Sequence, residues 1–154
     1  NAQHLKALSG DVLATLVQPF LVQRGIAATD LTDGRLLPLC ELFKDRCDTL
    51  VALADWVRVF YAEVTPQEAE RAQHVTPAIA PALDALAEAL ATCAWDKASF
   101  GSALKQVLAA HGLKMPQLAM PARVLVVGTA QTPSVDAVLE LMGREKVVAR
   151  LKSR

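Results

Sequence analysis

The fold class is indicated by a stretch near the start of the chain, residues 9–21, which reads SGDVLATLVQPFL. Its large apolar residues lie at positions 12, 13, 16, 17, 20 and 21, so they form interleaved i, i+4, i+8 rows along one helical face. Ser9 precedes this pattern, and Gly25 after it is a typical helix stop. The stretch therefore predicts an amphipathic helix with one buried face.

Similar spacings recur along the rest of the chain. Ala and Leu, which are good helix formers, dominate the composition, and few stretches alternate strictly between apolar and polar residues. Further helices are predicted at about residues 36–44, 50–60, 79–90, 97–111, 132–142 and 144–151. Asp48 and Thr49 offer an N-cap for the helix at 50–60, Asp96 is an expected N-cap, and Gly112 is an expected stop. The sequence thus predicts an all-α fold.

The chain is expected to divide into two small helical subdomains near residue 65. Thr65-Pro66-Gln67-Glu68 matches a capping box, with Thr at the N-cap, Pro at N1 and Glu at N3. We therefore predict an N-terminal subdomain at residues 1–64 and a C-terminal subdomain at residues 65–154.

Residues 115–127 are the most ambiguous part of the sequence. Pro116 and Pro121 predict a bend over residues 115–122. The run Val124-Leu125-Val126-Val127 is apolar and rich in β-branched residues, so propensity alone predicts a short strand there.

The net charge of the chain is zero, but its N-terminal part is acidic and its C-terminal part is basic. Residues 1–96 hold 7 Lys and Arg against 13 Asp and Glu, whereas residues 97–154 hold 9 against 3. No acidic residue lies between Lys97 and Val135. Such a basic half could attract phosphates. Solvated Lys and Arg near helix C-termini give the same pattern, so charge alone leaves both readings open.

The chain offers little chemistry of its own. It has no apolar run of roughly 18 residues that would cross a membrane, no phosphate-binding loop and no dinucleotide fingerprint. The histidines are scattered and no metal-ligand set is visible. Three cysteines are expected to be free thiols in a reducing compartment, which favours the cytoplasm. Two alternatives stay open, a helical protein-interaction module and a small enzyme that uses Cys47 or Cys93.

Three segments together resemble the C-terminal region of bacterial glutamate–tRNA ligases. These segments are residues 41–50 (ELFKDRCDTL) with Phe60-Tyr61, residues 114–123 (KMPQLAMPAR) running to Gly128, and residues 131–135 (QTPSV) continued by 139–145 (LELMGRE) and 148–151 (VARL). Their order and spacing match that family over essentially all 154 residues. Asn1 resembles an asparagine that follows the catalytic domain in the family, and the chain is accordingly expected to begin inside a longer protein.

The resemblance implies a cage of helices in two subdomains that holds the anticodon loop of glutamate tRNA, with Val124–Val127 helical. In this family the full-length parent activates glutamate with ATP and Mg²⁺ and transfers it to the tRNA. The nucleotide-binding signatures of the parent are absent from these 154 residues. We therefore expect no cofactor, no metal and no catalysis in this chain. Its expected partners are the tRNA and its own catalytic domain, in a cytoplasmic monomer.

Two arginines are carried over from the resemblance as site residues. Arg46 lies at the predicted break between two helices and matches the arginine with which the family reads the third anticodon base. A planar guanidinium can donate to base acceptors and stack on rings. Without the family, an ion pair with Asp45 or Asp48 explains Arg46 as well. Arg123 matches a second family arginine at the anticodon.

Thr132, Pro133 and Val135 complete the expected tRNA site. Thr132-Pro133 matches a turn that packs against the anticodon loop, and the same pair also predicts the start of a helix, whose N-terminus offers N–H donors. Val135 matches a position at which the family usually has a larger aliphatic base contact, although core packing is an equal alternative. Ser134 replaces the glycine common in the family.

Overall fold

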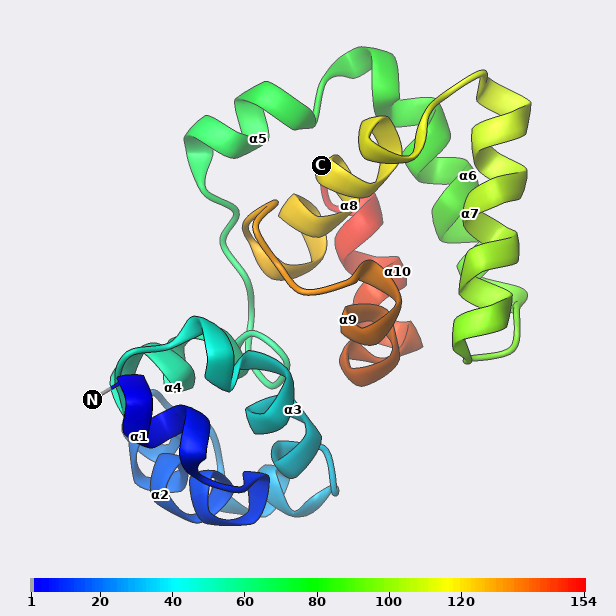
Figure 1. Cartoon of the computed structure of the whole chain (residues 1–154). Helices are drawn as coiled ribbons and strands as arrows, with labels where there is room; N and C mark the ends of the chain where they lie inside the picture. Colours follow the sequence, from blue (N-terminus) through cyan, green and yellow to red (C-terminus); the bar gives the residue numbers. More distant parts are fainter. Residues whose placement is uncertain (1) are drawn as a thin grey trace. The chain divides into compact units, whose positions relative to one another are not determined.

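The computed structural model describes residues 2–154, with side chains described from Leu5 onward. Asn1, matched above to a family asparagine, lies outside the described residues. Over residues 2–154 the chain forms helices and no strands, which confirms the all-α prediction (Figure 1). The helices are α1 (Ala2–Ala7), α2 (Gly10–Gln23), α3 (Leu36–Phe43), α4 (Leu50–Arg58), α5 (Glu68–His74), α6 (Ala80–Thr92), α7 (Lys97–His111), α8 (Met115–Val127), α9 (Val135–Met142) and α10 (Arg144–Lys152). Three short 3₁₀ helices, η1 (Ala28–Thr32), η2 (Lys44–Arg46) and η3 (Pro77–Ile79), lie between them.

The chain forms two compact units, residues 1–63 (unit 1) and residues 64–154 (unit 2). In unit 1, α2 packs against both α3 and α4. The aromatic centre of its core is Phe43, which stacks on Trp56 at 5.0 Å between ring centroids and meets Phe60 edge-on at 5.7 Å. Phe43 and Phe60 are fully buried. The predicted caps of this unit are confirmed, since Ser9 accepts a hydrogen bond from Val12 and Thr49 accepts one from Ala52.

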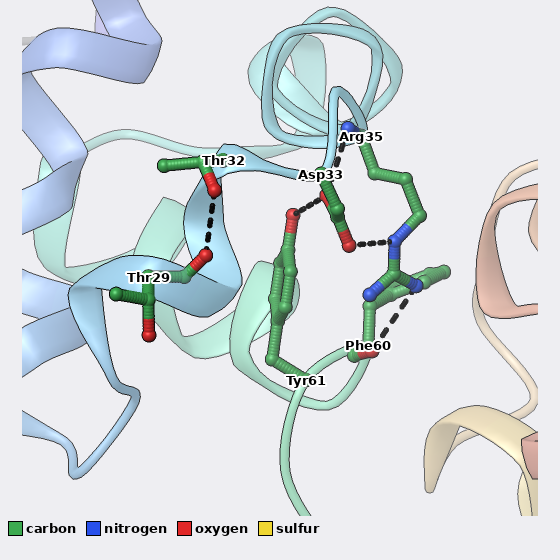
Figure 2. Close-up of polar contacts among 6 residues, drawn as sticks. All are labelled: Thr29, Thr32, Asp33, Arg35, Phe60 and Tyr61. Carbon is green, nitrogen blue, oxygen red and sulfur yellow. Dashed lines mark hydrogen bonds and ion pairs between the residues drawn. The ribbon is translucent and has the colours of Figure 1, made fainter.

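Asp33, Arg35 and Tyr61 form a polar cluster near the end of unit 1 (Figure 2). The Asp33 carboxylate accepts from Arg35 Nε at 2.7 Å and from the Tyr61 hydroxyl at 3.3 Å. The Arg35 guanidinium lies 4.5 Å from the centre of the Tyr61 ring and donates to the Phe60 carbonyl. Partial burial would raise the pKa of Asp33, but hydrogen bonds from Arg35 and its positive charge hold that pKa below its ordinary value.

The lowered pKa of Asp33 predicts a pH-dependent contribution to stability. Because the carboxyl ionises more readily in the folded chain, the contribution is present above its unfolded pKa of about 3.9 and is lost as the pH falls through the lower, folded value. Asp33→Asn should therefore destabilise unit 1 at pH 7 and much less at pH 3. The cluster is partly exposed, so the effect should stay below about 1 kcal/mol. Urea unfolding followed by Trp56 fluorescence at both pH values measures it, and equal losses at both would contradict it.

Unit 2 is built around α8. In Figure 1, α6 and α7 run side by side, and α10 packs against both α6 and α8. Buried residues of α8 occupy positions on every side of the helix, among them Leu118, Val124, Leu125 and Val126. Asp96 caps α7 by accepting from Ser99 at 2.8 Å, and Gly112 ends that helix with φ of 63°, as the sequence predicted.

The predicted bend and strand at residues 115–127 are wrong, because α8 runs through both. Pro116 lies in the first turn, where the missing N–H would have no helical partner. Pro121 leaves the carbonyl of Gln117 without its helical donor, but Gln117 is exposed, so water can take that place. The run from Val124 to Val127 is helical, as the family resemblance implied, because packing on all sides overrides a four-residue propensity.

The predicted capping box at Thr65-Pro66-Gln67-Glu68 is also wrong. Helix α5 begins at Glu68 with Gln67 at its N-cap, and no side-chain cap hydrogen bond forms. Instead, the Gln67 N–H donates to the Gly128 carbonyl at 2.9 Å. A contact far along the chain therefore holds residues 64–67 outside the helix.

Candidate nucleic-acid interface

Arg46 lies at the end of η2, in the break between α3 and α4 that the sequence predicted. Its side chain is exposed, while the residues on either side of the break, Phe43 and Cys47, are buried. The buried neighbours fix the path of the backbone, and the guanidinium is left at the surface. The break therefore presents a cation from a well-anchored turn, which suits recognition better than a long flexible loop would.

Glu41 and Lys44 anchor the same turn from the other side. The Glu41 carboxylate accepts from the Gly10 N–H at 2.6 Å and pairs with Lys44 Nζ at 2.9 Å. Lys44 also donates to the Leu8 carbonyl at 3.1 Å. The hydrogen bond from Lys44 lowers the pKa of Glu41, and the bond from Gly10 adds to this effect. Lys44 thus ties the turn to the start of α2, whereas Arg46, two residues on, reaches the surface.

Arg123 lies on the half-buried side of α8, between the buried residues Ala122 and Val124. Its Nη1 lies 3.9 Å from the sulfur of Met120, one turn earlier. Pro121 precedes it within the helix. The buried residues on either side restrict where this guanidinium can reach, so Arg123 is a more constrained donor than Arg46.

Thr132 and Pro133 lie in the segment between α8 and α9, and both are buried. The Thr132 hydroxyl donates to the Pro133 carbonyl at 2.8 Å. The expectation that this pair starts the helix is wrong by two residues, because α9 begins at Val135 with Ser134 at its N-cap. The hydroxyl of Thr132 serves the turn, not the helix.

Val135 is half-buried at the first position of α9, at the edge of the face formed by Val138, Leu139 and Met142. The next residue, Asp136, accepts from the Ala137 N–H at 2.8 Å. A hydrogen bond from Ser134 lowers the pKa of Asp136, so a carboxylate already lies at the N-terminus of α9. A phosphate there would meet this negative charge, and the predicted use of α9 N–H groups as phosphate donors is therefore disfavoured.

The structure therefore places the five expected site residues in two groups. Arg46 belongs to unit 1, and Arg123, Thr132, Pro133 and Val135 belong to unit 2. Within unit 2, Thr132 and Pro133 lie in the short segment that follows α8, and Val135 begins α9.

Sequence reasoning missed a residue that touches this segment. Glu70 on α5 accepts a hydrogen bond from the Ala130 N–H at 3.3 Å, across 60 residues of sequence. Nothing in the sequence distinguishes Glu70 from Glu68 on the same short helix. The role of Glu70 could have been predicted only from knowledge that residues 64–70 contact residues 128–130 in the folded chain.

The cysteines behave as core residues. Cys40 and Cys47 are buried, and Cys93 is half-buried. Burial raises the pKa of the Cys40 thiol to about 12 and that of the Cys47 thiol to about 11, with nearby acidic charges adding to both. Because the thiolate is the nucleophile, these values disfavour the alternative of an enzyme based on Cys47. Among residues 2–154, no cluster of three or more metal-binding side chains is found, and no helix is long and apolar enough to span a membrane.

The chain therefore consists of two all-helical units, with Arg46 at an exposed helix break of the first and Arg123 on a half-buried side of α8 in the second. The chain belongs to the anticodon-binding domain family, whose model matches residues 12–154. This match confirms the resemblance drawn from the three segments.

Curated relatives carry the name glutamate–tRNA ligase. The chain is 69% identical to the ligase of Paracidovorax citrulli, over 99% of this chain and 32% of that protein. It is 66% identical to the ligase of Verminephrobacter eiseniae, over 100% of this chain and 33% of that protein. The chain thus spans about a third of the length of these relatives.

Solved structures share the fold. The crystal structure of a glutamate tRNA ligase from Elizabethkingia meningosepticum superimposes with a TM-score of 0.83 at 22% identity, over 98% of this chain and 30% of that one. The glutamate–tRNA synthetase of Elizabethkingia anophelis gives a TM-score of 0.76 at 20% identity. At such identities the likeness concerns the fold alone.

Proposed function

We propose that this chain is the C-terminal anticodon-binding region of a glutamate–tRNA ligase, and that it recognises the anticodon loop of glutamate tRNA. The observation that carries the proposal is Arg46, an exposed guanidinium on a turn anchored by buried Phe43 and Cys47. Anticodon bases are unpaired, so their edges and faces are open to such a group. The name and high identity of the curated relatives support the choice of tRNA.

In this proposal both predicted subdomains, residues 1–64 and 65–154, contribute to recognition. Arg46 reads a base from the first, while Arg123 and the Thr132–Pro133 turn with Val135 contact the loop from the second. The full-length parent is a cytoplasmic, monomeric enzyme that uses ATP and Mg²⁺ in a separate catalytic domain to attach glutamate to the tRNA. The chain itself recognises and does not catalyse.

Binding as a function of salt tests the proposal directly. The chain should bind glutamate tRNA, and the logarithm of its affinity should fall linearly with the logarithm of salt concentration, because phosphate contacts release counterions. A glutamate tRNA with a substituted anticodon should bind more weakly at every salt concentration. Equal binding of the two tRNAs would contradict anticodon recognition.

Arg46→Ala in the full-length ligase is expected to lower kcat/KM for glutamate tRNA. The decrease should correspond to a loss of roughly 1–3 kcal/mol in transition-state stabilisation, the contribution of one good base contact. The loss should vanish when the base that Arg46 reads is substituted. Lys6→Ala removes a positive charge from another exposed position of unit 1 and should have little effect. Unchanged kinetics with Arg46→Ala would mean that this arginine serves only surface ion pairing.

A helical protein-interaction module remains the second candidate. It is favoured by a mainly apolar groove on unit 1 between α1, α2 and α4, where Asp48 and Thr49 line one part and the remaining lining residues are Leu5, Leu8, Leu16, Phe20, Leu50 and Val51. Leu16 and Val51 are 42% and 47% exposed, which is high for large apolar side chains. Binding through this groove would depend weakly on salt, unlike binding to tRNA.

A further inference from the structure

The segment that carries Thr132 and Pro133 is attached to α5 by a pair of contacts. The Gln67 N–H donates to the Gly128 carbonyl at 2.9 Å, and Glu70 Oε1 accepts from the Ala130 N–H at 3.3 Å. We propose that Glu70 is a positioning residue for anticodon recognition, which sets the Thr132–Pro133 turn without touching the RNA. This inference rests on the proposed function.

Close packing makes this attachment specific. Gly128 has φ of +102°, a conformation that favours glycine, and a Cβ built on it would lie 3.1 Å from Val64 Cγ2 and 3.4 Å from the Thr65 carbonyl oxygen. The start of the segment therefore lies directly against residues 64–67. The hydrogen bond to Glu70 then fixes Ala130, two residues before Thr132.

Two further hydrogen bonds lie within the segment. Gln131 N–H donates to the Thr129 hydroxyl at 3.2 Å, and the Thr132 hydroxyl donates to Pro133, so both bonds are local. Local bonds can shape a turn, but they cannot place it relative to α5 and α8. Gln67 and Glu70 supply two long-range hydrogen bonds, and of these two only the Glu70 bond is made by a side chain.

The second carboxylate oxygen of Glu70 is in an unfavourable environment. Its Oε2 is buried and has no hydrogen-bond partner among the described residues. A buried carboxylate oxygen in that state is unfavourable for stability. Glutamine keeps the acceptor for Ala130 and removes the charge, so it should preserve the position of the turn. Alanine removes the acceptor and leaves the partly buried Ala130 N–H without it.

The test uses the full-length ligase with Glu70→Ala, Glu70→Asp, Glu70→Gln and Glu68→Ala. Steady-state kinetics are measured with glutamate tRNA and with the same tRNA carrying a substituted anticodon. Glu70→Ala should raise KM for glutamate tRNA about threefold to tenfold, the measure of one hydrogen bond, and leave kcat and the KM values for ATP and glutamate unchanged. Glu70→Asp, one methylene too short, should behave the same way, and it replaces Glu70→Ala if thermal melting shows that variant to be unfolded.

Two further variants and the substituted tRNA show whether Glu70 acts by positioning the turn or through its charge alone. Glu70→Gln should restore the wild-type KM, and Glu68→Ala, which removes the same charge from an exposed site on α5, should match wild type. The substituted tRNA should show a smaller KM change with Glu70→Ala than glutamate tRNA does. An equal change with both tRNAs, or no change with either, would overturn the inference. If wild type itself fails to distinguish the two tRNAs, the proposed function fails instead.

Discussion

Phe43→Ala is expected to lower the free energy of unfolding of unit 1 by about 3–5 kcal/mol, the range for removing a fully buried aromatic side chain. Phe43 is 0% exposed and contacts both Trp56 and Phe60 through ring pairs. Its loss removes buried apolar area and leaves a cavity that the surrounding helices cannot close completely. Because Phe43 precedes Arg46 by one turn, tRNA affinity should fall as well.

The two tryptophans allow each unit to be followed separately, since Trp56 lies in unit 1 and Trp95 in unit 2. Urea unfolding of Phe43→Ala in a Trp95→Phe background reports unit 1 alone. The matched control is Leu37→Ala on the same helix, where the side chain is 41% exposed and the loss should be much smaller. A loss below about 1 kcal/mol for Phe43→Ala would contradict the core described here.

Arg150→Met should lower the free energy of unfolding of unit 2 by roughly 1.5–3 kcal/mol, the range for a hydrogen bond from a charged donor. Arg150 is only 9% exposed, and its Nη1 donates to the Val126 carbonyl at 2.8 Å and contacts Met142 Sδ at 3.1 Å. Val126 lies in the last turn of α8, where carbonyls have no helical donor. Methionine keeps most of the apolar stem but leaves this buried carbonyl without its donor.

Urea unfolding followed by Trp95 fluorescence in a Trp56→Phe background measures this loss. Lys152→Met is the matched control, because it removes a positive charge from an exposed site on the same helix. Its effect should stay within about 0.5 kcal/mol. If the two variants lost equal stability, the helix charge and not the buried hydrogen bond would be responsible.

Arg144, in the segment Gly143-Arg144-Glu145 that contributed to the family resemblance, makes contacts within unit 2. The Arg144 guanidinium lies 5.2 Å from the centre of the Trp95 ring and donates to the Cys93 carbonyl. Trp95 Nε1 in turn donates to the Leu139 carbonyl at 3.2 Å. Arg144 and Trp95 therefore join the loop between α6 and α7 to α9 and the start of α10.

The sequence by itself determined the helices whose signals are local. Ser9, Thr49 and Asp96 cap helices through bonds to residues three positions on, and Gly112 ends one through its own backbone conformation. The break at Arg46 was predictable for the same reason, because it lies between two helices with clear signals. Caps and stops act over a few residues, so they can be found without knowing what packs where.

Tertiary structure decided everything that depends on distant partners. Helix α8 continues through the β-branched run 124–127 because all four of these residues are buried, and α5 starts late because Gln67 is bonded to Gly128. The buried roles of Glu70 and Arg150 depend on backbone groups 60 and 24 residues away. Residue type and local spacing carry no information about such pairings, because the free energy that fixes them arises only when the chain has folded.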